Sequence, residues 1–245
     1  MQRTYAIGDV HGYLDKLRQV HELIEADRAA DGGQGPVVHI GDLMDRGPDA
    51  AGVIEFVISG IAAGRPWIVL KGNHERMMSY FLQAAPHPDA KLRNDLSWLH
   101  PRLGGMMTLA SYGVQGTIED YYALHQAARA AVPAAHRAFL SGLDTSFRTD
   151  EVVFVHAGIR AGGGREAEVE DDLVWIREPF LSDVRDHGAL IVHGHTPVEA
   201  VTHYGNRVNI DSGVAFGGPL SAIVIEGRDV WRLTPDGREA LLATN

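Results

Sequence analysis

The sequence predicts an α/β fold in one domain that spans residues 1–245. Short apolar runs of strand length alternate with helical patterns up to about residue 82, as they do in βαβ units. Strand-length runs return after Phe147, and no linker separates two domains. Five of the apolar runs end in Asp, Asn or His beside a glycine, which places polar side chains where strands end.

The first third of the chain alternates strands with helices. Leu14, Leu17 and Ile24 recur at helical spacing until Asp31, after which two glycines end the helix. A second helix begins near Pro48, because proline is favoured in a first helical turn. The expected elements are a strand at 5–7, a helix at 14–31, a strand at 37–40, a helix at 48–61, a strand at 67–70 and a helix at 75–83.

The middle of the chain, residues 84–144, follows another pattern. It is helical but irregular, and four prolines interrupt it. We therefore expect a helical insertion that lies over or beside the sheet. After it, strands are expected at 152–155, 190–192, 207–210, 221–225 and 230–233, with a surface loop at 161–170.

The composition excludes several classes of function. The chain has no cysteine, which rules out disulfides, thiolate metal sites and a cysteine nucleophile. A formal net charge of −10 disfavours binding to nucleic acid through its phosphates. No apolar run reaches the length of a membrane span, and the first strand begins too early to leave room for a signal peptide. We expect a cytoplasmic protein with neither a nucleic-acid nor a membrane partner.

The five strand ends are the clearest indication of function. In open α/β sheets, ligands bind outside the carboxyl ends of the strands, so these junctions are expected to form one site. The junctions are Gly8-Asp9-Val10-His11-Gly12, Gly41-Asp42-Leu43-Met44-Asp45-Arg46-Gly47, Gly72-Asn73-His74-Glu75, His156-Ala157-Gly158 and His193-Gly194-His195-Thr196.

Six side chains from these junctions supply oxygen and imidazole nitrogen donors, namely Asp9, His11, Asp42, Asn73, His156 and His195. Such a set suits manganese, iron, zinc or magnesium. Six ligands are too many for one tetrahedral zinc ion. They suit two ions about 3.5–4 Å apart, the spacing used for phosphoryl displacement. Asp42 can bridge two ions through its two carboxylate oxygens.

The motifs also carry a family resemblance. The junctions at 8–12, 41–47 and 72–75 resemble the three-part phosphoesterase motif of the serine/threonine phosphoprotein phosphatases, which are calcineurin-like metallophosphoesterases. The likeness is greatest to the small phage lambda and bacterial members and to the symmetrical diadenosine tetraphosphatases. It extends from Ile7 to about Gly218. It implies a central β-sandwich of mixed sheets flanked by helices, with the site along one edge.

The resemblance implies a role for each residue of the site. One ion would be held by Asp9, His11 and Asp42, and the other by Asp42, Asn73, His156 and His195. His74 would be the general acid for the leaving oxygen, oriented by Asp45. Arg46, Asn73 and Arg177 would bind the phosphate. Attack would be direct, by a hydroxide that bridges two divalent ions, for which Mn²⁺ is expected.

Two nearby residues have open roles. His193 lies two positions before His195, but the family pattern places the metal on the histidine after Gly194. His193 is therefore expected to hydrogen-bond nearby. Asp211 either accepts a hydrogen bond from a metal-binding histidine, on the ring nitrogen that does not bind the metal, or belongs to an ordinary turn at a strand end.

The expected function is dimetal-dependent hydrolysis of phosphomonoesters, with phosphoserine and phosphothreonine in proteins as the expected substrates. The alternative is hydrolysis of a phosphoanhydride such as diadenosine tetraphosphate. Both reactions use the same metals and water, and they differ in what surrounds the site. A non-catalytic phosphate-binding relic is disfavoured, because such a relic would be expected to have lost a ligand or the acid. The sequence does not indicate an oligomeric state.

Overall fold

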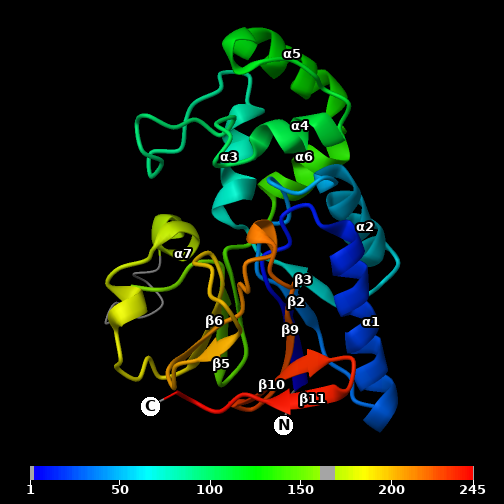
Figure 1. Ribbon diagram of the computed structural model, residues 1–245, viewed down its shortest axis with the longest axis vertical. Helices are drawn as coiled ribbons and strands as arrows, with labels where there is room; N and C mark the ends of the chain where they lie inside the picture. Colours follow the sequence, from blue (N-terminus) through cyan, green and yellow to red (C-terminus); the bar gives the residue numbers. More distant parts are fainter. Residues whose placement is uncertain (1–2, 161–168, 245) are drawn as a thin grey trace.

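The computed structural model describes residues 3–160 and 169–244 and contains two mixed sheets at its centre (Figure 1). The six-stranded sheet has the order β11-β10-β9-β1-β2-β3, and the five-stranded sheet has the order β4-β5-β6-β8-β7. Parallel neighbours are β1 (Arg3–Ile7), β2 (Val37–His39) and β3 (Trp67–Val69) in the first sheet, and β5 (Val152–Val155), β6 (Leu190–His193) and β8 (Arg207–Asn209) in the second. The antiparallel strands are β4 (Ser146–Arg148), β7 (Thr202–His203), β9 (Ala222–Glu226), β10 (Asp229–Thr234) and β11 (Gly237–Ala240).

The two sheets pack face to face, which confirms the predicted sandwich. Successive side chains of a strand point to opposite faces, so each strand contributes to two layers. Ala6 of β1 packs with Phe154 and Val192 of the other sheet in the inner layer. Its neighbours Tyr5 and Ile7 pack outward into a second apolar layer. The inner layer brings the carboxyl ends of both sets of parallel strands to the same end of the molecule.

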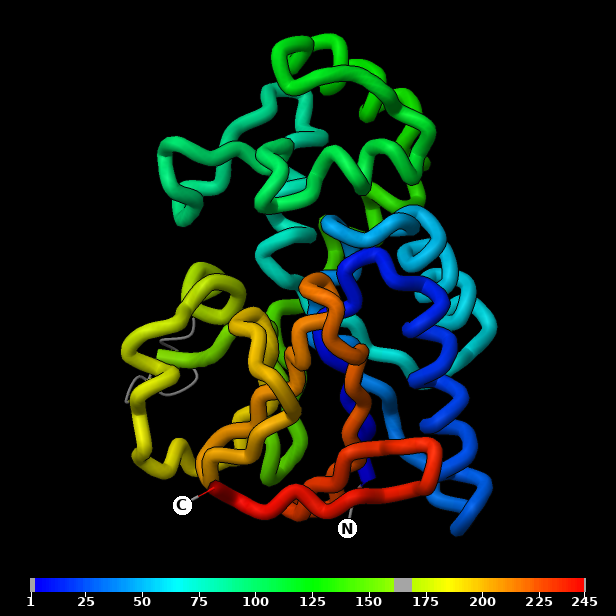
Figure 2. Tube along the Cα trace, viewed as in Figure 1, coloured from blue at the N-terminus to red at the C-terminus, as the bar shows by residue number. Residues whose placement is uncertain are grey.

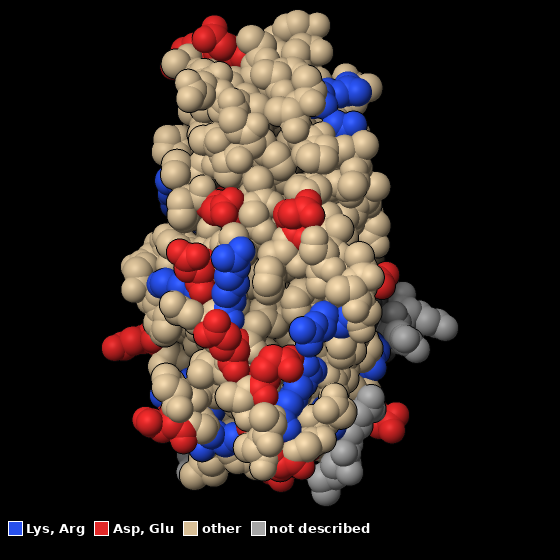
Figure 3. Space-filling model, turned by 90° about the vertical axis from the view of Figure 1, so that its right-hand side faces the viewer, with Lys and Arg blue, Asp and Glu red and all other residues tan. Residues whose placement is uncertain are grey.

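Helices cover both outer faces of the sandwich. Helices α1 (Leu14–Asp31) and α2 (Ala50–Ala62) lie against the six-stranded sheet, and α7 (Glu170–Trp175) packs against the five-stranded sheet. Short 3-10 turns are η1 (Ile118–Asp120), η3 (Phe180–Ser182) and η4 (Val214–Phe216). Figure 3 shows the face that carries α1 and α2, where acidic and basic side chains are intermixed over the lower half.

The region predicted as an insertion forms a helical layer above the sandwich. Helices α4 (Gly105–Ser111), α5 (Tyr121–Ala131) and α6 (Ala134–Ser141) share an apolar core with α3 (Asn73–Phe81). Figure 2 shows this layer at one end of the molecule and both chain termini at the other. The loops that follow the parallel strands lie between the helical layer and the sheets.

Several element boundaries differ from the expected ones. The second helix begins at Ala50, because the Asp49 side chain accepts a hydrogen bond from Gly52 N and caps the helix. The third begins at Asn73, so Asn73 and His74 lie in its first turn. Most of the predicted 161–170 loop lies outside the described residues, but Glu170 already belongs to helix α7. Within the described ranges, no helix is both long and apolar enough to cross a membrane.

Candidate active site at the strand ends

Side chains from the five strand ends converge in the described structure. His11, Asp42 and His74 place ligand atoms within 4.8 Å of one another, and Asp42, His156 and His195 form a second such group. All five of these residues are buried. They follow β1, β2, β3, β5 and β6, so the edge predicted from the sequence is the place where potential metal ligands meet.

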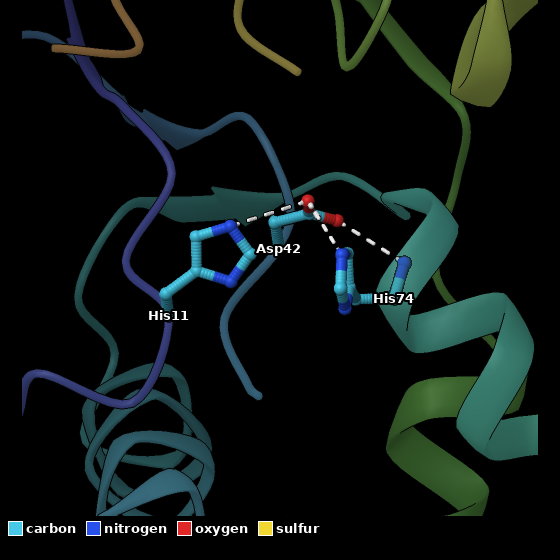
Figure 4. Close-up of side chains that lie close together, drawn as sticks. All are labelled: His11, Asp42 and His74. Atoms are coloured by element: carbon cyan, nitrogen blue, oxygen red, sulfur yellow. Dashed lines mark hydrogen bonds and ion pairs between the residues drawn. The ribbon is translucent and has the colours of Figure 1, made fainter. Parts of the chain in front are cut away.

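Asp42 lies between the two groups. One of its carboxylate oxygens, Oδ2, is 3.6 Å from His11 Nε2 and 3.8 Å from His74 Nε2. The other, Oδ1, is 3.3 Å from His156 Nε2. Figure 4 shows the Asp42 carboxylate between the His11 and His74 rings, which come from different segments of the chain. Asp42 therefore has the geometry of a residue that can serve two ions at once.

Backbone carbonyl groups fix the tautomers of two histidines on the side of each ring that faces away from the site. His11 Nδ1 is 2.8 Å from the carbonyl oxygen of Met44, and His156 Nδ1 is 3.0 Å from that of Ile40. A carbonyl only accepts, so each ring donates its Nδ1–H and keeps the Nε2 lone pair toward the site. Burial lowers the pKa of both imidazoles below the usual value. Burial thus favours the neutral form of both rings, which is the form that binds metal.

Lone pairs face one another in the second group. Asn73 Oδ1 lies 3.0 Å from His156 Nε2 and 2.8 Å from His195 Nδ1. Because the proton of neutral His156 is donated to a carbonyl, no hydrogen remains to join its Nε2 to Asn73 Oδ1. A cation between the two atoms would remove this repulsion. Within the described residues, Asp9 Oδ1 and His195 Nε2 are also buried without a hydrogen-bond partner, which fits divalent ions.

Asp9 approaches the site from β1 but lies outside the first group. Its Oδ2 accepts a hydrogen bond from the backbone N–H of His195, at 3.1 Å. Burial raises the pKa of Asp9 well above its usual value, and the nearby carboxylates of Asp211 and Asp42 raise it further. Asp211 therefore lies beside the site, where its own pKa is raised to about 6, mainly by burial.

His74 differs from the other histidines of the site. Its Nδ1 is 2.5 Å from Asp45 Oδ2, and Asp45 is fully buried. Burial alone would lower the pKa of His74, but the carboxylates of Asp42 and Asp45 outweigh it and raise the pKa above the usual value. A ring that keeps its proton is poorly suited to bind a metal and well suited to donate that proton.

Two arginines predicted to bind phosphate also reach the site. The guanidinium of Arg46 contacts Nε2 of both His11 and His74, at 2.5 and 3.1 Å. Arg177 Nη2 lies 3.5 Å from the carbonyl oxygen of His195. Both arginines line a cavity of about 550 Å³ whose wall also includes Asp42, Asn73, His74, Lys91, Leu92, Arg93, Leu96, Arg102, Leu103, Trp175, His195 and Phe216.

The structure separates the two histidines of the fifth junction. His193 is fully buried, and its Nε2 accepts a hydrogen bond from Arg207 Nη1 at 3.2 Å. Its Nδ1 lies 3.1 Å from the carbonyl oxygen of Gly194. Both ring nitrogens of His193 therefore have protein partners, whereas His195 lies with Asp42 and His156.

Backbone conformation marks the same residues. Positive φ angles are strained for residues other than glycine, and such strain gathers at functional sites. In the described part of the chain, every non-glycine residue with positive φ belongs to the predicted site: His11 (46°), Asp42 (50°), Asp45 (70°), Arg46 (68°) and His195 (65°).

Sequence reasoning missed several residues around the site. Trp98 and Thr108 of the helical layer both hydrogen-bond the Asp45 carboxylate. Lys91, Arg93, Arg102 and Phe216 line the cavity. None of them belongs to a motif, and all but Phe216 lie in the 84–144 region, which the sequence indicates only as an irregular helical insertion.

Comparison with known proteins agrees with this geometry. Residues 2–224 match the model of the calcineurin-like phosphoesterase family. A protein of Halalkalibacterium halodurans named bis(5'-nucleosyl)-tetraphosphatase PrpE [asymmetrical] is 28% identical, over 89% of this chain and 87% of its own length. A protein of Anoxybacillus flavithermus with the same name is 26% identical, over 89% of this chain and 88% of its own.

Two solved structures share the fold. A chain provisionally named a diadenosine tetraphosphatase has a TM-score of 0.63 at 18% identity and covers 98% of this chain and 94% of its own. A cold-active protein tyrosine phosphatase has a TM-score of 0.66 at 19% identity and covers 99% of this chain and 79% of its own. The family model matches nearly the whole chain, and the potential metal-ligand atoms of the chain lie together at the strand ends. The chain therefore belongs to the calcineurin-like phosphoesterases.

Proposed function

We propose that this metallophosphoesterase hydrolyses a phosphoanhydride bond in a dinucleoside polyphosphate such as diadenosine tetraphosphate. The observation that carries the proposal is the charge of the cavity wall. Among the residues that the structure describes, five basic side chains line the cavity, namely Arg46, Lys91, Arg93, Arg102 and Arg177, and Asp42 is the one carboxylate. This wall belongs to a chain whose net charge is −10. A local excess of positive charge suits a substrate with several phosphates.

The extra cations lie where a single phosphate would not need them. Arg46 and Arg177 come from the sandwich loops and suffice for one phosphate group. Lys91, Arg93 and Arg102 come from the helical layer. Lys91 pairs with Asp171 and Arg93 with Asp95, but these are exposed pairs that contribute little and can be exchanged for phosphate oxygens.

An exposed aromatic ring stands at the same cavity. Phe216 is 69% exposed, and the guanidinium of Arg46 lies 5.4 Å from the centre of its ring. A planar ring beside a phosphate-binding arginine can stack a nucleobase. The cavity volume of about 550 Å³ lies in the ordinary range for small-molecule sites.

The names of the relatives support the same substrate class. Both reported relatives are named as asymmetrical bis(5'-nucleosyl)-tetraphosphatases. The expected preference for phosphoserine and phosphothreonine is therefore supported less well than its alternative. The structural likeness to a protein tyrosine phosphatase shows the fold alone, because its identity to this chain is 19%.

The chain's own residues would divide the chemistry among them. When bound by Asp9, His11, Asp42, Asn73, His156 and His195, two divalent ions would activate a water and neutralise phosphate charge. Arg46 and Arg177 would hold the equatorial phosphate oxygens, and their charge would stabilise the transition state. His74 would then donate its proton from Nε2 to the leaving oxygen while Asp45 holds Nδ1.

A direct comparison of substrates tests the proposal. Purified protein with Mn²⁺ should hydrolyse diadenosine tetraphosphate with a kcat/KM about 10- to 100-fold above that for a phosphoserine peptide, since one or two further charge-assisted contacts are worth that factor. Chromatography of the products would show whether AMP and ATP or two ADP molecules form.

A matched pair of variants tests the charge argument. Arg102→Ala should lower kcat/KM for diadenosine tetraphosphate and leave that for p-nitrophenyl phosphate unchanged. Arg18→Ala, on the distant helix α1, should change neither. If the wild-type protein had a higher kcat/KM for the phosphoserine peptide than for diadenosine tetraphosphate, the proposed substrate class would be refuted.

A further inference from the structure

The carboxylate of Asp45 is held mainly by the helical layer. Asp45 follows β2 in the sandwich, is fully buried and has a φ of 70°. Its Oδ2 accepts from His74 Nδ1 at 2.5 Å and from Trp98 Nε1 at 2.7 Å, and its Oδ1 accepts from Thr108 Oγ1 at 2.5 Å. Two of these three donors therefore come from the 84–144 region.

We propose that Trp98 and Thr108 are positioning residues for the proton donor His74 and that they act through Asp45. The inference rests on the proposed acid role of His74. A carboxylate can rotate about its Cβ–Cγ bond, and a single partner does not fix it. With Trp98 on one oxygen and Thr108 on the other, one orientation remains in which Oδ2 meets His74 Nδ1.

Thr108 holds both the backbone and the side chain of Asp45. Its hydroxyl accepts a hydrogen bond from the Asp45 backbone N–H at 2.9 Å while it donates to Oδ1. Thr108 is fully buried in α4, and the start of α4 lies directly against the same loop. A Cβ atom at Gly104 would come within 2.3 Å of the backbone nitrogen of Arg46.

Trp98 is fixed by the apolar core of the helical layer. It is 5% exposed, and its ring centroid lies 5.0 Å from that of Phe81. Leu99 and Leu103 belong to the same cluster. The direction of the indole N–H is thus set by how the layer packs. The helical layer supports the catalytic machinery in addition to lining the substrate cavity.

Single substitutions separate this role from simple packing. Trp98→Phe removes the N–H and keeps an aromatic ring, and Thr108→Val removes the hydroxyl at nearly constant volume. Each should lower kcat for phenyl phosphate, whose phenolate is a poor leaving group, and should lower kcat for p-nitrophenyl phosphate less. The two losses should differ by about tenfold, the factor expected for one lost hydrogen bond. KM and metal content should not change. Thr108→Ser, which keeps the hydroxyl, should have the wild-type ratio of kcat for phenyl phosphate to kcat for p-nitrophenyl phosphate.

The chain offers a matched control. Trp67→Phe removes an indole N–H that has no partner among the described residues, far from Asp45 in the outer apolar layer. It should leave the ratio of the two kcat values unchanged. Thermal unfolding of all variants identifies any that fail to fold, and Thr108→Ser keeps the test open if Thr108→Val is one of them.

The same substitutions in a His74→Asn background test the route of the effect. If Trp98 and Thr108 act through His74, neither Trp98→Phe nor Thr108→Val should add a leaving-group-dependent loss there. A persistent loss, or single variants that match Trp67→Phe, would overturn the inference and leave the acid role standing. If His74→Asn itself shows no leaving-group dependence, the acid role and the inference both fail.

Discussion

The histidines of the site differ because their surroundings differ. His11, His156 and His195 are buried, and burial lowers the pKa of each ring. His74 is equally buried, but the carboxylates of Asp42 and Asp45 overcome burial and raise its pKa. We propose that this difference suits the neutral rings of His11, His156 and His195 to bind metal and the protonated ring of His74 to donate a proton.

The acid role of His74 predicts a particular kinetic defect. His74→Asn should lower kcat by about 10²–10⁴-fold for esters with poor leaving groups and by less for p-nitrophenyl phosphate. The acid must be protonated, so its raised pKa keeps the wild-type protein active above pH 6.5 or so, the usual histidine value. Activity should fall at higher pH as His74 loses its proton, and the variant should lack this basic limb. Equal losses on both esters would contradict the role.

The choice between the histidines of the fifth junction predicts a difference in metal content. His195→Ala should reduce the bound metal from near two ions per chain to near one, as measured by elemental analysis after dialysis. His193→Ala should keep near two ions, because both nitrogens of His193 have protein partners. Loss of an ion from the His193 variant alone would show that the metal role was assigned to the wrong histidine.

At the scale of elements, Glu75 joins two of the strand ends. Its Oε2 accepts from the backbone N–H groups of Asp42 and Gly72, at 2.9 and 2.7 Å, and its Oε1 accepts from Leu43 N at 2.7 Å. This fully buried carboxylate thus ties the loop after β2 to the start of α3. The distance between Asp42 and Asn73 depends on that tie.

The tie predicts a loss of stability when it is broken. Glu75→Gln should lower the free energy of unfolding by about 1–3 kcal/mol, because an amide group can accept at one atom only and leaves buried N–H groups without a partner. Metal affinity should fall as well. Glu22→Gln on the exposed side of α1 is the control, and chemical denaturation with metal titration measures both effects. A Glu75 variant as stable as this control would show that the tie contributes little.

Sequence patterns predicted the parallel strands and their ends well, because buried parallel strands are continuous apolar runs and glycine marks the turns after them. They missed β4, β7 and β11, which are short and mostly polar at the surface. They also missed α7, whose first turn holds three acids rather than an apolar pattern. The third helix was expected to begin at Glu75, but it begins at Asn73 with Gly72 as its N-cap.

The contacts of Trp98 and Thr108 with Asp45 could not be predicted in this way. The two residues lie 53 and 63 positions from Asp45 in a region without regular periodicity. Their proximity follows from how α3, α4 and the loop between them pack, and no local pattern encodes that packing. Motif residues are visible in a sequence because chemistry fixes their types, whereas supporting residues depend on the assembled fold.

For the molecule as a whole, the site gathers negative charge that its metals would neutralise. Burial raises the pKa of Asp9 well above its usual value, that of Glu75 to about 7 and that of Asp211 to about 6, and neighbouring carboxylates reinforce each shift. Without metal, we expect the folded protein to hold protons there that the unfolded chain releases near pH 4. Folding and metal binding are therefore linked to pH.

This linkage predicts that stability falls with rising pH only in the metal-free protein. A carboxyl whose folded pKa is raised binds more protons in the native state, so the free energy of unfolding decreases as pH rises toward that pKa. The buried neutral histidines have the opposite effect, but only below about pH 6.5, where their unfolded forms become charged. Glu75, whose folded pKa is about 7, and Asp9 should therefore lower the stability of chelator-treated protein as the pH rises between about 6.5 and 8.

Denaturation in urea at several pH values across that window measures the effect. Protein saturated with Mn²⁺ should be more stable by about 2.7 kcal/mol or more at a hundredfold excess over Kd, and its stability should vary little with pH, because the ions hold the carboxylates in their charged form. Asp9→Asn should flatten the pH dependence of the metal-free protein. If the metal-free and metal-saturated proteins showed the same pH dependence, Asp9 would not be a metal ligand. The proposed dimetal site would then have to be abandoned.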